Sequence, residues 1–266
     1  MSQKPDKKDA SSPWGLPEAD FKLEVERIRR AAAQRGVLLR LVGALAFHLH
    51  CPQYCYLQAS LGRQFTDIDF ASYREHIPEI KKLFSDLGYE EDFMVARLFG
   101  QRRLLFYDHV NGRHSDVFID QMEFCHDLPL RGRLEVDPLS LPLAELVVEK
   151  MQIVQINEKD IIDTIMLLRE HPVGTSDDEV INAKVIAQLC AQEWGLWKTM
   201  SINLAKVKEM AKGYEQLGQA DKDDILTKVD RLLEFMEKEP KPMKWRMRAK
   251  VGERVKWWRD VEELSR

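Results

Sequence analysis

The residues best suited to chemistry are two aspartates in the segment Thr66-Asp67-Ile68-Asp69. If this segment is a strand, side chains two positions apart point to the same face, with their Cα atoms about 6.5 Å apart. Two carboxylates aimed at the same place repel each other, and a divalent cation neutralises both at once. The alternative is a pair of solvated aspartates at a strand end, because Asp-x-Asp is a common sequence. The pattern alone leaves both interpretations open.

A third carboxylate lies in the apolar segment from His114 to Asp120. As a strand, this segment would carry Asp116 and Asp120 on one face, about 13 Å apart. Only one of them can therefore join Asp67 and Asp69. We expect it to be Asp116, which lies inside the strand, and we interpret Asp120 as a turn or cap residue. Three carboxylates on adjacent strands can hold two Mg²⁺ ions about 3.5–4 Å apart, an arrangement that serves phosphoryl and nucleotidyl transfer.

Hydrophobic periodicity predicts helices and strands around these acids. The expected helices are 17–35, 45–50 and 78–87, and the expected strands are 37–42, 65–70, 93–99, 103–107 and 115–119. Asn111-Gly112 between the last two strands is a strong hairpin signal. Gly43-Ala44 lies between a strand and a helix, an arrangement that brings backbone N–H groups near a phosphate.

The second half of the chain is predicted to be almost wholly helical. The expected helices are 142–155, 159–169, 177–193, 200–217 and 221–239. We therefore predict a mixed α/β domain over residues 16–140 and an α-helical domain over 141–266. Residues 1–15 are polar and lysine-bearing, and we expect them to form a disordered tail.

The order of these elements over residues 37–170 resembles the polymerase-beta-like nucleotidyltransferase superfamily. The resemblance rests on Gly43-Ala44 after an apolar strand, Arg63 with the Asp-x-Asp segment, a later apolar strand bearing Asp116, and Lys150 followed by Lys159-Asp160-Ile161-Ile162-Asp163. The last element is similar to the AbiEii-type nucleotidyltransferases of bacterial toxin–antitoxin systems. The resemblance implies an α/β (α+β) fold, in which a mixed sheet with flanking helices is followed by an α-helical C-terminal region.

The resemblance also implies a role for each matching residue. Asp67, Asp69 and Asp116 would be catalytic and would hold Mg²⁺. The residues implied to contact the nucleoside triphosphate (NTP) are Gly43, Ala44, Arg63, Thr66, Lys150 and Asp160. Ala44 departs from the family, which has Gly or Ser at this position, and the lost hydroxyl bears on catalysis more than on nucleotide binding.

Two of these roles have plainer alternatives. Lys150 can be an ordinary solvated lysine. Asp160 and Asp163 can be a capping acid and a surface acid near a helix N-terminus, where negative charge is favourable. On a helix, residues three apart are neighbours, so the two acids can also act together.

The implied function is a magnesium-dependent nucleotidyltransferase that moves an NMP from an NTP to a hydroxyl of an RNA such as tRNA, or of a protein. A toxin role with a cognate antitoxin partner follows from the same resemblance. Two other functions stay open. One is a non-catalytic nucleotide- or RNA-binding module of the same fold, which Ala44 favours. The other is a metal-dependent phosphodiesterase.

The composition is that of an ordinary globular protein, with 44% hydrophobic and 32% charged residues. A net charge of −4 gives no overall attraction to nucleic acid, so phosphate binding must come from local patches. The sequence has no apolar run of about eighteen residues, which predicts no membrane span. Its start lacks the apolar stretch of a signal peptide, so we expect none there. The four cysteines do not make a disulfide framework. We expect a cytoplasmic location.

Four metal-binding side chains cluster at His48, His50, Cys51 and Cys55. A structural zinc site needs four ligands, commonly two pairs of Cys or His. No second Cys-x-x-Cys or His pair follows downstream. We therefore interpret the cluster as a helix end with small buried thiols.

The C-terminal region is strongly basic and carries three tryptophans. The residues concerned are Lys241, Lys244, Arg246, Arg248, Lys250, Arg254, Lys256 and Arg259, with Trp245, Trp257 and Trp258. Such a segment can bind RNA through phosphate contacts and stacking. It can equally be a basic amphipathic helix whose tryptophans pack on the body of the protein.

Overall fold

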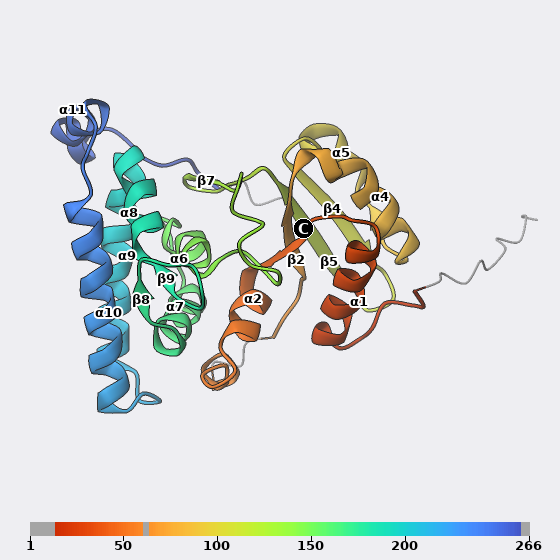
Figure 1. Cartoon of the computed structure of the whole chain (residues 1–266), viewed down its shortest axis with the longest axis horizontal. Coiled ribbons are helices and arrows are strands. Elements are labelled where there is room, and N and C mark those ends of the chain that lie inside the picture. The colour runs from red at the N-terminus through yellow and green to blue at the C-terminus, as the bar shows by residue number, and fades with distance from the viewer. Residues whose placement is uncertain (1–13, 61–63, 262–266) are drawn as a thin grey trace, which may run out of the picture.

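The structure is a computed structural model that describes residues 14–60 and 64–261. Arg63 and residues 1–13 of the expected tail lie outside the described residues. The described chain has a mixed α/β fold, in which a five-stranded sheet carries flanking helices and the second half is mostly helical (Figure 1). The mixed α/β class expected from the sequence is confirmed.

Five strands form the main sheet in the spatial order β1-β2-β5-β4-β3. They are β1 (Arg40–Val42), β2 (Asp69–Ser72), β3 (Glu90–Glu91), β4 (Arg103–Asp108) and β5 (Arg113–Ile119). β2 and β5 run parallel, whereas the other neighbouring strands are antiparallel. β4 and β5 form the hairpin that Asn111-Gly112 predicts, with Gly112 at a φ of +69°.

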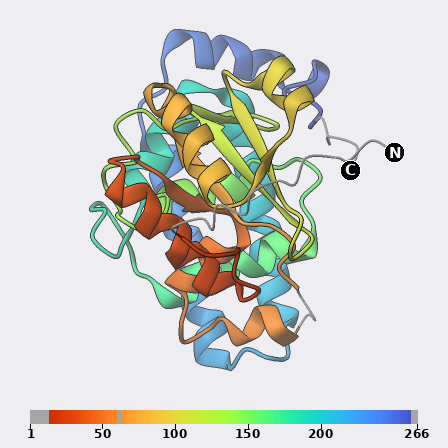
Figure 2. The same ribbon diagram turned by 90° about the vertical axis from the view of Figure 1, so that its right-hand side faces the viewer.

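The first half also contains five α-helices among its described residues. They are α1 (Phe21–Gln34), α2 (Gly43–His50), α3 (Tyr56–Ser60), α4 (Ile77–Asp86) and α5 (Phe93–Phe99), with a 3₁₀ turn η1 at Arg74–His76. Figures 1 and 2 show α1 and α4 on one side of the sheet. On the other side, α2 packs against two helices of the second half.

The prediction of a strand over 93–99 is wrong, because these residues form α5. The side chain of Asp92 accepts a hydrogen bond from the backbone N–H of Val95, which caps the helix. The apolar side chains that suggested a buried strand are largely in solvent, with Phe93 73% and Leu98 66% exposed. The local cap, and not burial in the sheet, therefore decides the conformation.

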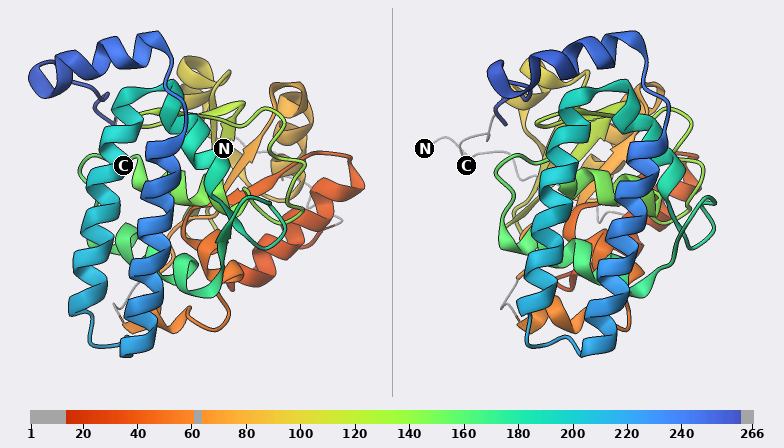
Figure 3. Two further views of the ribbon diagram at one scale, coloured as in Figure 1. Left: turned by 60° about the vertical axis from the view of Figure 1, so that its left-hand side comes forward. Right: turned by 90° about the vertical axis from the view of Figure 1, so that its left-hand side faces the viewer.

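The remaining α-helices of the described chain lie in the second half, with two short strands there and two more between β5 and the first of these helices. The helices are α6 (Leu143–Met151), α7 (Glu158–Glu170), α8 (Ala183–Gln192), α9 (Trp194–Gly213), α10 (Gln219–Lys238) and α11 (Met243–Val251), with a 3₁₀ turn η2 at Gly252–Arg254. The strands are β6 (Gln121–Glu123), β7 (Asp127–Pro129), β8 (Val173–Gly174) and β9 (Ile181–Asn182). Figure 3 shows α9 and α10 side by side as the longest helices of the molecule.

The expected helix over 177–193 begins only at Ala183. The side chain of Asn182 accepts hydrogen bonds from the N–H groups of Lys184 and Val185, so it is the N-cap. Asn182 and the residue before it form β9, which pairs in parallel with β8. The acids at 177–179 therefore lie in a loop between two short strands.

One continuous hydrophobic core joins the two halves. Phe47 of α2, Phe70 of β2, Leu146 of α6 and Ile162 of α7 belong to the same cluster, and each is fully buried. The boundary that we expected near residue 140 is therefore crossed by shared packing. No helix among the described residues is long and apolar enough to cross a membrane.

After α11, the chain returns from the helical half towards the sheet (Figure 1). Trp245 donates through Nε1 to the Cys190 carbonyl (2.9 Å), and Trp257 donates to Thr199 Oγ1 (3.1 Å). Trp257 also packs edge-on against Trp194, at 5.9 Å between ring centroids. These two tryptophans therefore pack on the body of the protein, as the second interpretation of the basic region predicts.

Candidate active site beside strands β2 and β5

Asp69 and Asp116 lie side by side on the two parallel strands. Phe70 pairs with Val117 in the register of β2 and β5, so the residues that precede them are neighbours. The backbone N–H of Asp116 donates to Asp69 Oδ1 over 3.1 Å. The two strands therefore bring together carboxylates that lie 47 positions apart in the sequence.

Asp67 lies just before β2, where it forms a parallel bridge with His114. Its Oδ2 atom is 3.6 Å from His114 Nε2 and accepts a hydrogen bond from Thr66 Oγ1 (3.2 Å). Asp67 is thus held on both sides by neighbouring side chains, and Thr66 contacts the acid next to it. The expected strand over 65–70 is shorter than predicted, since β2 begins at Asp69.

The pKa of the Asp69 carboxyl is raised well above the ordinary value. Burial is the largest cause, followed by the negative charges of Asp67 and Asp116, while the N–H group of Asp116 partly opposes the rise. Glu149 adds a smaller increase. Because burial and like charges disfavour the ionised form, this position favours a bound proton or a cation.

Arg103 on β4 forms a bidentate ion pair with Asp116. Its Nε atom is 2.7 Å from Asp116 Oδ1, and its Nη2 atom is 2.8 Å from Oδ2. Asp116 is only 1% exposed, so the guanidinium compensates a buried charge. In the register of the hairpin, Arg103 lies opposite Phe118, two residues beyond Asp116.

The donor set fits Mg²⁺ chemically, because carboxylate oxygens are the ligands that this ion prefers. The three aspartates are nevertheless not a compact ligand group. Among the residues that the structure describes, the group with one ligand atom from each of three residues all within 4.8 Å of one another is His50, His171 and Glu179. Since Arg103 holds Asp116, the better placed pair for an ion is Asp67 and Asp69.

Helix α2 begins at Gly43, directly after β1. Gly43 has a φ of +72°, in the left-handed region that favours glycine. A Cβ atom at this position would lie 3.6 Å from Asp69 Oδ2, so the start of the helix faces the aspartates. The Gly43 N–H donates to Glu149 Oε2 over 3.3 Å. A helix N-terminus stabilises an anion, and in this structure the anion is the Glu149 carboxylate.

Lys150 at the end of α6 lies among three acids. Its Nζ atom is 3.3 Å from Asp160 Oδ1, 3.4 Å from Glu149 Oε1 and 3.8 Å from Asp163 Oδ2. Its side chain is only 11% exposed, and Nζ lies 5.5 Å from the centre of the Phe47 ring. Lys150 is therefore an internal charge partner and not a solvated surface lysine.

Gln58 on α3 connects this acidic group to the start of α2. Its Nε2 atom donates to Asp163 Oδ1 (2.8 Å) and to the carbonyl of Ala44 (3.3 Å), while its Oε1 atom is 3.1 Å from His48 Nδ1. Asp163 is fully buried. The N-cap of α7 is Asn157, whose side chain accepts from the N–H of Asp160, so neither acid caps this helix.

Two cavities adjoin these residues. One of about 700 Å³ is lined by Arg103, and one of about 630 Å³ is lined by Glu149, Lys150 and Asp160. Residues 258–261 and Phe124 line both. The chain after α11 therefore forms a wall shared by the two cavities, next to the ion pairs of Asp116 and Lys150.

Sequence reasoning did not single out Arg103, Glu149, Gln58 or His114. Arg103 and His114 could have been found from the hairpin, because pairing β4 with β5 places Arg103 two residues from Asp116 on a neighbouring strand. Glu149 precedes Lys150, which was a candidate. Gln58 carries no motif, and its role depends on where α3 packs.

Chemically, the arrangement combines oxygen ligands for a divalent cation, a helix N-terminus, and internal cations at Arg103 and Lys150. These are the parts that bind and polarise phosphate groups. A comparison with protein-family models finds no match for this sequence, and comparisons with curated proteins and with solved structures find none either.

Proposed function

We propose that this chain is a magnesium-dependent nucleotidyltransferase that moves an NMP from an NTP to a hydroxyl acceptor. The observation that carries the proposal is the position of the Asp69 carboxylate. It is exposed to the negative charges of Asp67 and Asp116, and it lies beside Gly43, the first residue of α2. Burial, followed by the charges of the neighbouring acids, raises its pKa, and a divalent cation bound there would stabilise the ionised carboxylate.

In this proposal, Asp67 and Asp69 hold Mg²⁺, which when bound neutralises triphosphate charge and polarises the α-phosphate. Gly43 allows phosphate oxygens to approach the first turn of α2, because no side chain stands between its backbone and Asp69. Phosphate binding there requires the Glu149 carboxylate to leave the Gly43 N–H, since two anions would compete for one donor. Lys150, whose Nζ atom is 3.4 Å from Glu149 Oε1, supplies the positive charge next to this position.

Asp116 and Arg103 act as a pair on the acceptor side of the site. Asp116 accepts both hydrogen bonds of the guanidinium, which fixes the direction of its carboxylate. Arg103 also lines the larger cavity, where Phe118, Phe124 and Trp258 supply aromatic surface and Arg259, which is paired with Asp127, adds a second guanidinium. Aromatic rings beside arginines can stack bases and contact phosphates, so this cavity supports an RNA acceptor.

The test is incubation of the purified chain with radiolabelled NTPs, Mg²⁺ and bulk RNA, with pyrophosphate measured in parallel. We expect labelled RNA and stoichiometric pyrophosphate from the wild type, and loss of both in Asp67→Asn and Asp69→Asn. Asp178→Asn is the matched control, because Asp178 is an exposed acid in the loop between β8 and β9. Equal labelling by the wild type and Asp69→Asn would refute the proposal.

A second candidate function is nucleotide binding without transfer. The observation that favours it is the bidentate ion pair between Arg103 and Asp116, which neutralises the third carboxylate. Ala44, which offers no hydroxyl, points the same way. Mg²⁺-dependent NTP binding by calorimetry, together with no pyrophosphate release, would favour this function over transfer.

A further inference from the structure

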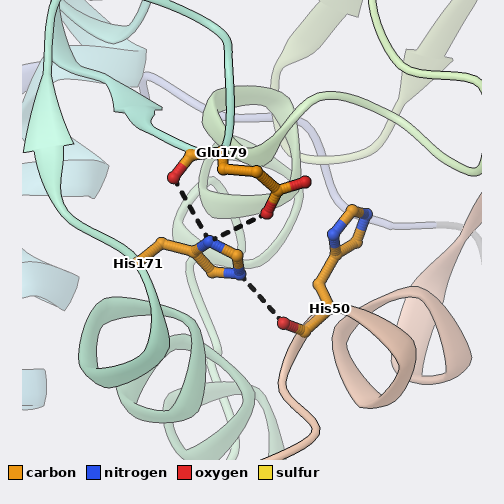
Figure 4. A group of neighbouring side chains, drawn as sticks. All are labelled: His50, His171 and Glu179. Carbon is orange, nitrogen blue, oxygen red and sulfur yellow. Dashed lines mark hydrogen bonds and ion pairs between the residues drawn. The ribbon is translucent and has the colours of Figure 1, made fainter.

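A second polar cluster lies away from the aspartates, where the ends of two helices meet a loop. His50 ends α2, His171 follows α7, and Glu179 lies in the loop between β8 and β9 (Figure 4). One ligand atom of each residue lies within 4.8 Å of the others. His50 and His171 are 8% and 6% exposed, whereas the Glu179 side chain is 71% exposed.

The hydrogen bonds of His50 fix its tautomer. Its Nε2 atom is 2.7 Å from Ser140 Oγ, and that hydroxyl donates its own proton to the Leu141 carbonyl over 2.6 Å. Ser140 Oγ therefore accepts from His50, which places the proton of a neutral ring on Nε2. The lone pair is then on Nδ1, and Figure 4 shows His50 turning one ring nitrogen towards Glu179 while the other points away.

The same argument holds for His171. Its Nε2 atom is 2.9 Å from the carbonyl oxygen of His50, which can only accept, so Nε2 carries a proton. Its Nδ1 atom faces two further oxygens, the Glu179 carbonyl and Oε2, each at 3.4 Å. A bare lone pair facing two oxygens is unfavourable, and a cation placed between them would remove the repulsion.

The second nitrogen of His50 adds to this argument. Its lone pair points into the space shared with His171 Nδ1 and Glu179, and a single cation placed there would contact all three residues. Ligating histidines typically donate their other ring N–H to an oxygen, as both rings do here, to Ser140 and to the backbone of His50.

We propose that His50, His171 and Glu179 form a Zn²⁺ site, through the two Nδ1 atoms and a carboxylate oxygen. Two imidazoles and one carboxylate suit Zn²⁺, whereas Mg²⁺ prefers oxygen ligands alone. Three protein ligands leave a fourth position for water, as in open zinc sites and unlike the closed four-ligand structural sites. The ion would fasten the loop that carries Glu179 to the junction of α2 and α7, where the two halves of the chain pack together.

This site differs from the group of His48, His50, Cys51 and Cys55, which the sequence indicates to be a helix end and not a zinc site. His48 contacts Gln58, and Cys55 Sγ contacts the Pro52 carbonyl, so both are engaged elsewhere. Of the four residues, the structure brings only His50 to the proposed site, and the other two ligands come from 121 and 129 positions further along the chain. No spacing motif could have revealed them.

The test is Zn²⁺ titration of the tag-free, chelator-treated full chain by calorimetry, in the background of Asp67→Asn with Asp69→Asn. That background removes the aspartate pair as a competing site, so the result does not depend on the proposed transferase function. We expect one equivalent of Zn²⁺ to bind and the thermal midpoint to rise. Co²⁺ in place of Zn²⁺ should give the visible absorption of a mixed nitrogen and oxygen site.

Glu179→Gln is the decisive variant, because this exposed side chain can change without disturbing the core. We expect its Zn²⁺ affinity to fall about tenfold or more, whereas Asp178→Asn in the same loop should bind like the parent. His171→Gln should also lose binding, with circular dichroism as the check on folding. No Zn²⁺ binding by the parent, or unchanged affinity in Glu179→Gln, would overturn the proposal.

Discussion

Replacing Gly43 by alanine separates backbone strain from effects on the site. Gly43 has a φ of +72°, and an L-residue in the left-handed region costs about 1–2 kcal/mol. The new Cβ would lie 3.6 Å from Asp69 Oδ2, which is ordinary van der Waals contact, so no clash adds to this cost. We therefore expect Gly43→Ala to lower the free energy of unfolding by about 1–2 kcal/mol.

The chain offers a matched control in Gly112. This glycine has a φ of +69°, and a Cβ there would meet nothing within 4 Å. Gly112→Ala should therefore show the same strain, at the tip of the hairpin and not beside Asp69. Urea denaturation of both variants should give similar losses of stability.

Nucleotide binding should then differ between the two variants. In Gly43→Ala, a methyl group stands between the first turn of α2 and the aspartates, so Mg²⁺-dependent NTP binding should weaken by tenfold or more, equivalent to about 1.4 kcal/mol. Gly112→Ala should bind NTP as the wild type does. Equal NTP affinity in both variants would refute the inference that phosphate approaches at Gly43, even if the stability losses agree.

Three further predictions concern the charges and packing of the site. Arg103→Met should lower the free energy of unfolding by about 3–5 kcal/mol, because Asp116 would keep a buried charge without a partner guanidinium. In thermal denaturation, Mg²⁺ should then stabilise this variant more than it stabilises the wild type. Because the pKa of Asp69 is raised, a proton on its carboxylate competes with the cation. The affinity for Mg²⁺ should therefore fall as the pH drops through that raised pKa. In calorimetric titrations at a series of pH values, Asp69→Asn should flatten this pH dependence. Trp257→Phe removes the hydrogen bond to Thr199 and should cost about 0.5–1.5 kcal/mol in urea denaturation, with Phe93→Tyr on exposed α5 unchanged.

The same raised pKa has an effect on stability, and its sign is opposite to that of a salt-bridged acid. A folded-state pKa above the unfolded value means that the folded chain binds the Asp69 proton more tightly. The contribution of Asp69 to stability is therefore fully present at pH below its unfolded pKa, and is lost as pH rises through the raised folded pKa. Without Mg²⁺, Asp69→Asn should then be relatively more stable than the wild type at neutral pH.

The sequence predicted the main features of the fold where periodicity and turn chemistry agree. The β4–β5 hairpin follows from Asn111-Gly112, and α2 follows from a strand that ends in small residues. It failed at 93–99, where the cap at Asp92 outweighed an apolar run. Local signals of a single residue can therefore reverse a prediction made from composition.

The candidate site was predictable only in its acids. Asp67, Asp69 and Asp116 stand in recognisable patterns, and β2 and β5 place the last two side by side. The partners of the acids were predictable only in part. Arg103 follows from pairing β4 with β5, whereas Gln58 reaches Asp163 through the packing of α3. The sequence could not have predicted that His171 and Glu179 lie near His50, because this depends on how the two halves of the chain pack.

The core shared by α2 and α7 has a consequence for how the molecule would respond to a bound ligand. Because Phe47 and Ile162 belong to one buried cluster, neither half can open without exposing apolar surface of the other. Slow amide exchange should then appear in α9 and α10 when nucleotide is added, although neither helix provides a candidate residue. The two long helices would act as distant reporters of occupancy at the aspartates.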